Sequence, residues 1–154
     1  MTHIKIALAT EKDRNQLLIF FKHYKVKKVI NNRVDCYLSH NFSIMAKDKN
    51  KIVGVLQWYI KENPQNGLVE FDEVFVFEGY RGKKIGSSMV EFAIQSVKNF
   101  FKKNKINPRR IYLFVSENNK VARALYEKYN FKYVSNIGYL FSDKEKDLMY
   151  ILKL

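Results

Sequence analysis

Residues 81–87 combine two glycines, three basic side chains and a serine in one short stretch, Arg-Gly-Lys-Lys-Ile-Gly-Ser. An apolar and aromatic run at 68–77 precedes this stretch and has the composition of a buried strand, and a helical apolar pattern follows from Ile85. The first backbone N–H groups of a helix have no intrahelical partner and carry partial positive charge. We therefore expect a cradle for an anion here, and a pyrophosphate is the group that fits it best.

Two other phosphate-binding patterns do not fit this loop. A Walker loop needs Gly-Lys-Ser/Thr after a four-residue gap, and a dinucleotide fingerprint needs Gly-x-Gly and an acidic strand end. Neither is present at 81–87. The alternative interpretation of the loop alone is a solvated connection between a strand and a helix.

Two segments, in the right order and spacing, resemble motifs of the GNAT superfamily of acyl-CoA N-acyltransferases. Residues 81–87 are similar to its Arg/Gln-x-x-Gly-x-Gly/Ala loop, and residues 119–131 to its Asn-x-x-Ala-x-x-Leu-Tyr-Glu-Lys-x-Gly-Phe helix. Asn130 replaces the glycine after that helix, and asparagine tolerates the left-handed conformation of a helix end. Lys84 stands where the first loop glycine usually lies, so its side chain either hinders close approach of the cofactor or points outward and adds charge.

The expected elements follow the order β-α-α-β-β-β-α-β-α-β-β. The strands are expected at 4–8, 42–46, 52–60, 68–77, 110–116, 131–141 and 147–152, and the helices from Thr10, at 29–38, 86–103 and 119–129. This order resembles the GNAT fold over nearly the whole chain, an α/β (α+β) fold with a mixed, mostly antiparallel sheet. A right-handed crossover makes the strands at 68–77 and 110–116 parallel neighbours, and the resemblance implies that they splay apart at one end.

The resemblance also implies which residues bind acetyl-CoA. The pantetheine arm would insert between the splayed strands and pair with the backbone of the earlier one, and the loop and the later helix would hold the rest. The implied cofactor-binding residues are Val74, Phe75, Val76, Arg81, Gly82, Lys83, Lys84, Ile85, Gly86, Ser87, Asn119, Ala122 and Tyr126. Asn119 also suits a helix N-cap, which is compatible with binding pantetheine.

Acidic residues interrupt the apolar strand that precedes the loop. A lysine-like amine has a pKa of ~10.4, so presenting it neutral near pH 7 costs about 4–5 kcal/mol, and a carboxylate in apolar surroundings can accept the proton. Glu70 lies eleven residues before Arg81, which matches the base of protein-lysine-acetylating members of the superfamily. Glu73 matches branches with an acid nearer the loop, and Asp72 is taken as a bystander. The alternative is that these carboxylates pair with basic neighbours.

Tyr126 is the candidate acid, which would protonate or hydrogen-bond the leaving thiolate. In the motif that this helix resembles, the tyrosine hydroxyl lies near the thioester sulfur, and a phenol can donate to a thiolate. A backbone N–H at 74–76 would stabilise the carbonyl oxygen. The alternative role of Tyr126 is a core aromatic on the stripe that includes Leu125.

Composition limits the class of protein. The 154 residues, 47% of them hydrophobic, suit a single domain over 1–154. No apolar run approaches the ~20 residues of a membrane-spanning helix, and we see no charged-then-apolar pattern of a signal peptide. A single cysteine, Cys36, cannot form a disulfide within the chain, which fits a reducing cytoplasm. Cys36 lies in an expected helix and is interpreted as a small buried hydrophobe. The three histidines lack ligand spacing, so we expect no metal.

The hypothesis is therefore a cytoplasmic acetyl-CoA-dependent N-acetyltransferase in which the amine attacks directly in a ternary complex. The net charge of +13 is compatible with coenzyme A, but it also fits a basic nucleic-acid-binding module, and a non-catalytic CoA-binding sensor is a further alternative. The acceptor is an amine of a small molecule or a protein, no membrane partner is expected, and the oligomeric state is left open, a homodimer included. Aromatic walls for the acceptor, with core packing as the alternative, are sought among Tyr24, Tyr37, Trp58, Tyr59, Tyr139 and Phe141.

Overall fold

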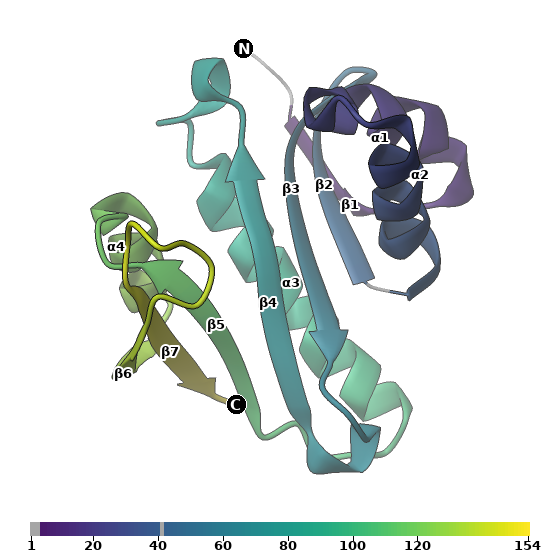
Figure 1. The fold of residues 1–154 in the computed structure, drawn as a ribbon. Coiled ribbons are helices and arrows are strands. Elements are labelled where there is room, and N and C mark those ends of the chain that lie inside the picture. Colours follow the sequence, from purple (N-terminus) through teal and green to yellow (C-terminus); the bar gives the residue numbers. More distant parts are fainter. Residues whose placement is uncertain (1–3, 41) are drawn as a thin grey trace. The chain divides into compact units, whose positions relative to one another are not determined.

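A computed structural model describes residues 4–40 and 42–154 of the chain, and in it seven strands are hydrogen-bonded in the order β1-β2-β3-β4-β5-β7-β6 (Figure 1). The strands are β1 (Ile4–Leu8), β2 (Phe42–Asp48), β3 (Lys51–Ile60), β4 (Leu68–Val76), β5 (Arg110–Ser116), β6 (Lys132–Gly138) and β7 (Asp147–Lys153). The helices are α1 (Arg14–Phe20), α2 (Lys27–Asp35), α3 (Ile85–Lys103) and α4 (Lys120–Lys128). The mixed, mostly antiparallel sheet with one parallel pair, β4 with β5, confirms the predicted fold class.

Contacts within the chain divide it into two compact units. One comprises the described residues up to Tyr59 together with Glu73–Ala93, and the other comprises Ile60–Asp72 and Ile94–Leu154. Both β4 and α3 therefore contribute residues to each unit. A single domain over the whole chain stays a prediction.

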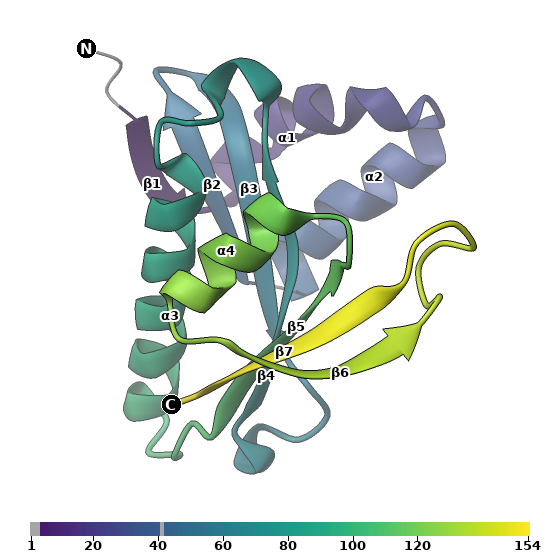
Figure 2. The same ribbon diagram turned by 90° about the vertical axis from the view of Figure 1, so that its left-hand side faces the viewer.

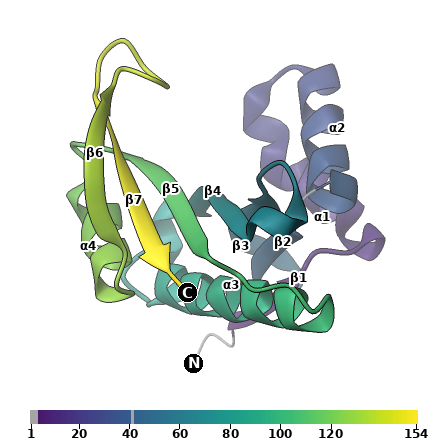
Figure 3. The same ribbon diagram turned by 90° about the horizontal axis from the view of Figure 1, so that it is seen from below.

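In the first unit, β1, β2 and β3 form two antiparallel ladders. Residues 52–58 of β3 are all buried, which matches their mainly apolar sequence, Gln57 excepted, and requires cover on both faces. Figure 3 shows α1 and α2 together on one side of these strands, and Met89 of α3 lies so close to Gly54 of β3 that a Cβ added to this glycine would be 3.1 Å from Met89 Cε. The core beneath α1 and α2 contains Leu17, Phe20, Phe21, Val34, Tyr37, Met45, Ile52 and Val55.

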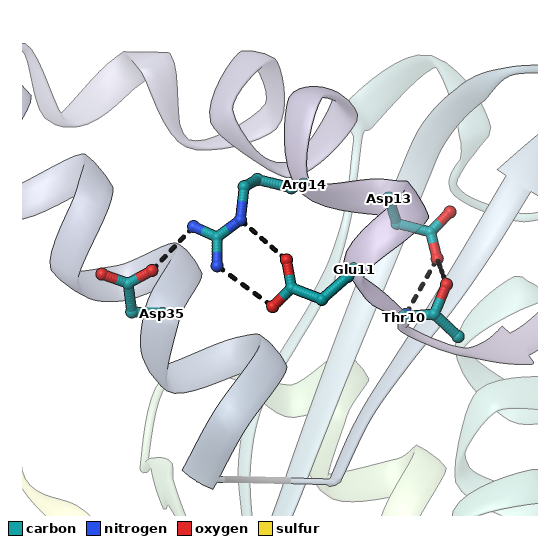
Figure 4. Close-up of polar contacts among 5 residues, drawn as sticks. All are labelled: Thr10, Glu11, Asp13, Arg14 and Asp35. Atoms are coloured by element: carbon teal, nitrogen blue, oxygen red, sulfur yellow. Dashed lines mark hydrogen bonds and ion pairs between the residues drawn. The ribbon is translucent and has the colours of Figure 1, made fainter.

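The first helical segment begins at Thr10, as predicted. Backbone N of Thr10 donates to Asp13 Oδ2 at 2.9 Å, and the helix opens as a 3-10 turn, Glu11–Asp13, that leads into α1 (Figure 4). Arg14 then connects α1 to α2, because its guanidinium donates to Glu11 Oε2 at 2.8 Å and to Asp35 Oδ1 at 2.7 Å. Glu11, in the first turn, and Asp35, at the end of α2, are thus linked through Arg14.

In the second unit, β7 pairs with β5 over seven residues and with β6 on its other side. Figure 2 shows α4 lying across one face of these strands. Tyr150 of β7 holds the helix, since its hydroxyl donates to Glu127 at 2.9 Å and accepts from Arg123 at 3.2 Å. The parallel ladder of β4 with β5 consists of three pairs, Leu68–Glu70 with Arg110–Tyr112, at the beginning of both strands.

Several helix and strand boundaries in the structure differ from the predicted ones. β6 ends at Gly138 rather than at residue 141, because Gly138 has φ +78° and the next backbone N–H groups turn to a side chain of β7. α2 begins at Lys27, two residues earlier than expected. The turn between β2 and β3 is shorter than the predicted five residues, with Lys49 in the left-handed region. In each case local turn geometry, which apolar periodicity does not report, sets the boundary.

Candidate functional site

The basic loop leaves β4 through a 3-10 turn, Glu78–Tyr80, and enters α3 at Ile85. Two of its cations bind backbone carbonyl groups nearby: Arg81 Nε donates to Val76 O at 3.1 Å, and Lys83 Nζ donates to Gly79 O at 3.2 Å. Ser88 N donates to Lys84 O at 3.0 Å, which closes the first turn of α3. The loop is therefore ordered by its own backbone and remains exposed from Arg81 to Lys84.

Gly82 and Lys84 both have positive φ, +76° and +60°. A Cβ added at Gly82 would meet nothing within 4 Å, so only the backbone conformation favours glycine there. Lys84 adopts the left-handed conformation that a glycine would adopt freely, which costs an L-residue roughly 1–2 kcal/mol. A backbone that alternates between the right-handed and left-handed regions is able to point successive N–H groups toward one anion.

Residues 74–76 of β4, the predicted partners of pantetheine, are half-buried, and their neighbours hold the backbone in several ways. The Val76 carbonyl accepts from Arg81, as above, and Phe77 N donates to Val53 O at 2.9 Å. A Cβ added at Gly54 of β3 would lie 2.9 Å from the Phe75 carbonyl oxygen, so the close approach of this backbone requires glycine.

Glu73 occupies the point where β4 becomes irregular, with φ +49°. Its carboxylate is bound by Arg33 Nη2, by Tyr37 Oη at 2.8 Å and by Tyr24 Oη at 3.4 Å. Burial is the largest single influence and works to lower the pKa of Arg33, but the charge and hydrogen bond of Glu73, together with Tyr37 and Tyr24, hold that pKa above its usual value. Burial and the Glu73 charge also raise the pKa of Tyr24. The predicted alternative, a carboxylate paired with a basic neighbour, therefore describes Glu73 well.

Glu70 lies in the second unit, on the short parallel ladder. It is opposite Tyr112 of β5, and Tyr112 Oη donates to Glu70 Oε2. The described hydrogen bonds and ion pairs show no cation on Glu70, whereas they show Arg33 on Glu73. The two candidate bases thus differ in their electrostatic partners.

Tyr126 is buried in α4, with 5% of its surface exposed. Its ring lies 5.7 Å from that of Phe131, which in turn lies 5.9 Å from that of Phe71 of β4. Burial, with a smaller contribution from the charge of Asp72, raises the pKa of Tyr126 above its usual value. The phenol therefore keeps its proton near neutral pH and can act as a hydrogen-bond donor.

The ends of α4 are as the sequence predicts. Asn119 is the N-cap, and its Oδ1 accepts from Ala122 N at 3.1 Å. Asn130 has φ +66°, the left-handed conformation expected after the helix, and Phe131 N donates to Tyr126 O at 3.1 Å. Caps at both ends fix the register in which Tyr126 faces the core.

The candidates divide between the two units. The loop at 81–87 and the segment 73–76 belong to the first unit, and Glu70, Asp72, Asn119, Ala122 and Tyr126 belong to the second. Sequence reasoning missed Arg33 and Tyr112 as carboxylate partners, because such long-range pairs have no local pattern. It also missed Gly54, although an isolated glycine in a strand pattern signals close backbone approach.

Other candidates are less suited to chemistry. Cys36 is exposed rather than buried as predicted, because the inward positions of its helical segment are taken by Val34 and Tyr37. Among the predicted aromatic walls, Tyr37 and Trp58 are core residues, whereas Tyr139 and Phe141 are exposed. No group of metal-ligating side chains occurs within residues 4–40 and 42–154. The same ranges contain no helix that is long and apolar enough to cross a membrane.

The described residues form a mixed sheet with one parallel pair, and a basic loop with two left-handed residues joins β4 to the long helix α3. A family model, the acetyltransferase (GNAT) family, matches residues 8–131. The chain belongs to this family, which confirms the membership predicted from the two motifs.

Known relatives match part of this chain. It is 33% identical over 86 residues to a spermine/spermidine N(1)-acetyltransferase of Bacillus subtilis, covering 56% of this chain and 53% of that protein. It is 39% identical over 72 residues to an N-alpha-acetyltransferase of Saccharolobus solfataricus, covering 47% and 40%. These alignments span about half, or less, of the relatives' length.

Solved structures match nearly the whole chain. A putative acetyltransferase from Salmonella typhimurium, solved with its cofactor acetyl-CoA, has a TM-score of 0.78 at 14% identity and covers 98% of this chain and 94% of that one. At this identity the likeness shows that the two proteins share a fold.

Proposed function

We propose that this protein transfers the acetyl group of acetyl-CoA to a primary amine by direct attack in a ternary complex. The observation that carries the proposal is the basic loop at 81–87, which is exposed from Arg81 to Lys84 and whose two left-handed residues lead into the N-terminus of α3. This geometry suits the pyrophosphate of coenzyme A, because backbone N–H groups and the helix dipole both favour an anion there. The family match supports the same cosubstrate.

In this mechanism the acetyl carbonyl carbon is attacked by the amine nitrogen. A C–N bond forms, the C–S bond breaks, the amine loses a proton to a base and coenzyme A leaves as a thiolate that is protonated afterwards. A backbone N–H of residues 74–76 is the proposed donor to the carbonyl oxygen as negative charge develops. No covalent acyl-enzyme is required, because the amine and the thioester are held together.

We assign the base to Glu70 ahead of Glu73. Arg33 neutralises Glu73, and two tyrosines also donate to it, so taking up a proton there would break an ion pair. Glu70 has a neutral partner, Tyr112, which holds the carboxylate in place without a formal positive charge. A water molecule is able to relay the proton where the amine does not reach Glu70 directly.

Tyr126 is proposed to donate a hydrogen bond to the departing thiolate. Burial and the charge of Asp72 disfavour its phenolate form. A completed proton transfer would leave a buried negative charge, so stabilisation by a hydrogen bond suits this environment better than full proton donation.

Two acceptor classes are suggested by the relatives. The Bacillus subtilis relative is named for spermine and spermidine, and the Saccharolobus solfataricus relative is named for N-alpha-acetylation. We therefore place small aliphatic amines and protein N-termini first among the acceptors to be tested.

The test is release of free thiol from acetyl-CoA against a panel of amines, with Glu70→Gln and Glu73→Gln compared. We expect Glu70→Gln to lower kcat by about a hundredfold with little change in the KM for acetyl-CoA, because positioned bases contribute about 10²–10⁴-fold. Glu73→Gln should mainly lower stability. A hundredfold loss confined to a well-folded Glu73→Gln protein would assign the base to Glu73, and no thiol release with any amine would contradict the proposed activity.

A further inference from the structure

Three aromatic rings in the second unit form a row between the surface and Glu70. Tyr112 donates to the Glu70 carboxylate, the Tyr112 and Phe114 ring centroids are 5.7 Å apart, and those of Phe114 and Phe141 are 5.9 Å apart. Exposure increases along this aromatic row (Tyr112, Phe114 and Phe141), from buried through half-buried to 69% exposed. The row therefore leads from solvent to a carboxylate.

Hydrogen bonds hold the backbone at the outer end of the aromatic row. Phe141 lies in the loop between β6 and β7, where Leu140 N and Phe141 N donate to Oδ2 of the buried Asp147 at 3.1 and 2.9 Å. At the far end of the same loop, Glu117 N donates to Lys146 O at 2.8 Å. The Phe141 ring is therefore exposed on a hydrogen-bonded backbone and next to Phe114, where a ligand is able to contact both rings.

We propose that the aromatic row binds the unbranched aliphatic stem of the acceptor, with the reactive nitrogen at Glu70. This inference rests on the proposed function and narrows its acceptor to alkylamines and polyamines. The carboxylate attracts the ammonium form of the amine, and the ring surfaces bind methylene groups and further cationic groups of the stem. A peptide N-terminus would instead place polar amide groups against apolar rings.

The decisive measurement is kcat/KM for a series of n-alkylamines from propylamine to hexylamine, assayed by thiol release at saturating acetyl-CoA. In the unmodified protein we expect kcat/KM to increase with each added methylene, up to about fourfold for a fully buried group. Phe141→Ala should flatten this dependence and leave the KM for acetyl-CoA unchanged. Phe141→Leu, which keeps an apolar contact, should give an intermediate slope.

Leu140→Ala is the matched control. Leu140 is in the same loop, is 56% exposed and has a backbone N–H on the same carboxylate, yet it is outside the aromatic row. The inference requires Leu140→Ala to retain the increase of kcat/KM with alkylamine length. Thermal unfolding checks that each variant is folded.

Three outcomes would overturn the inference. The assignment of the aromatic row is contradicted if kcat/KM still increases with alkyl length in Phe141→Ala. It is equally contradicted if Leu140→Ala loses this increase to the same extent. Turnover of peptide N-termini without turnover of any alkylamine refutes the inference while the proposed acetyl transfer stands. Absence of thiol release with every amine class would refute the proposed function itself.

Discussion

Among single residues, Tyr126 shows most directly how burial determines a chemical role. Its hydroxyl is carried by a helix capped at both ends, and its ring packs against Phe131. The surroundings raise its pKa, so it keeps its proton, which suits the hydrogen-bond donor role proposed for it. Lys84 shows a different effect, since it takes the left-handed conformation of a glycine while its side chain remains exposed and cationic. The departure from the family motif thus leaves the turn geometry intact.

Tyr126→Phe is expected to lower kcat about tenfold to a hundredfold while the KM for acetyl-CoA changes little. A hydrogen bond to a charged group is worth about 1.5–3 kcal/mol, and the thiolate is charged only as the reaction proceeds. Steady-state kinetics with both substrates varied measure this. Unchanged turnover would remove Tyr126 from the mechanism, and saturable acetyl-CoA binding without any turnover in the unmodified protein would favour a CoA-binding sensor.

The raised pKa of Tyr126 also makes stability depend on pH. The folded state holds this proton more tightly than the unfolded state, so the contribution is complete below the unfolded pKa of about 10 and is lost as pH rises toward the folded value. Above about pH 10 the free energy of unfolding should fall by up to ~1.4 kcal/mol per pH unit from this group. Urea unfolding from pH 9 to 11 should show a shallower fall in Tyr126→Phe. Equal slopes would contradict the assigned shift.

At the scale of elements, the end of β4 is held by its neighbours on both sides. Gly54 of β3 lets the Phe75 carbonyl approach, and Arg33 and Tyr37, from α2 and the π-helical turn Cys36–His40, bind Glu73 where the strand is irregular. Phe75 also packs against Phe20, with ring centroids 5.7 Å apart. These contacts hold the backbone segment that is proposed to bind pantetheine.

Gly54→Ala should disturb this segment without touching any proposed catalytic side chain. The new Cβ would lie 2.9 Å from the Phe75 oxygen and 3.1 Å from Met89 Cε, so β3 or β4 must shift. We expect stability to fall by about 1–3 kcal/mol, as for overpacked cores, and the KM for acetyl-CoA to rise more than kcat falls. The control is Gly79→Ala, because a Cβ there meets nothing within 4 Å. Equal effects of the two substitutions would show that Gly54 has no special role.

The element order and the α4 motif could be predicted because they depend on local patterns. Apolar periodicity places β3 and α3, and the Asn119 cap and the left-handed Asn130 are determined by neighbours in sequence. The partners of the carboxylates could not be predicted in this way. Arg33 is 40 residues from Glu73 and Tyr112 is 42 residues from Glu70, so the first pair forms only once α2 packs on the sheet and the second only once β4 and β5 are in register.

At the scale of the whole molecule, the net charge of +13 favours any polyanion, coenzyme A included. The division into two units does not follow the order of the chain, because the chain passes from one unit to the other after Tyr59, after Asp72 and after Ala93. All three boundaries lie inside an element: the first in β3, the second in β4 and the third in α3. Neither unit therefore consists of complete elements.

Because β4 and α3 are shared, we expect the chain to unfold as one cooperative domain. Calorimetry should give a single transition with equal calorimetric and van't Hoff enthalpies. Acetyl-CoA at about 100 times its Kd should stabilise the whole transition by about 2.7 kcal/mol. Two transitions, of which the ligand shifts one, would contradict the single-domain prediction.

The three points at which the chain crosses between the units also restrict how segments can be exchanged between this protein and a relative. No single crossover with a relative exchanges one whole unit and leaves the other unchanged, because each unit consists of two separate segments of the chain. Chimaeras that swap one intact unit need exchanges at several points at once. Phe141, the proposed contact of the acceptor, lies in the loop between β6 and β7, so a point substitution there tests acceptor preference without any exchange of segments.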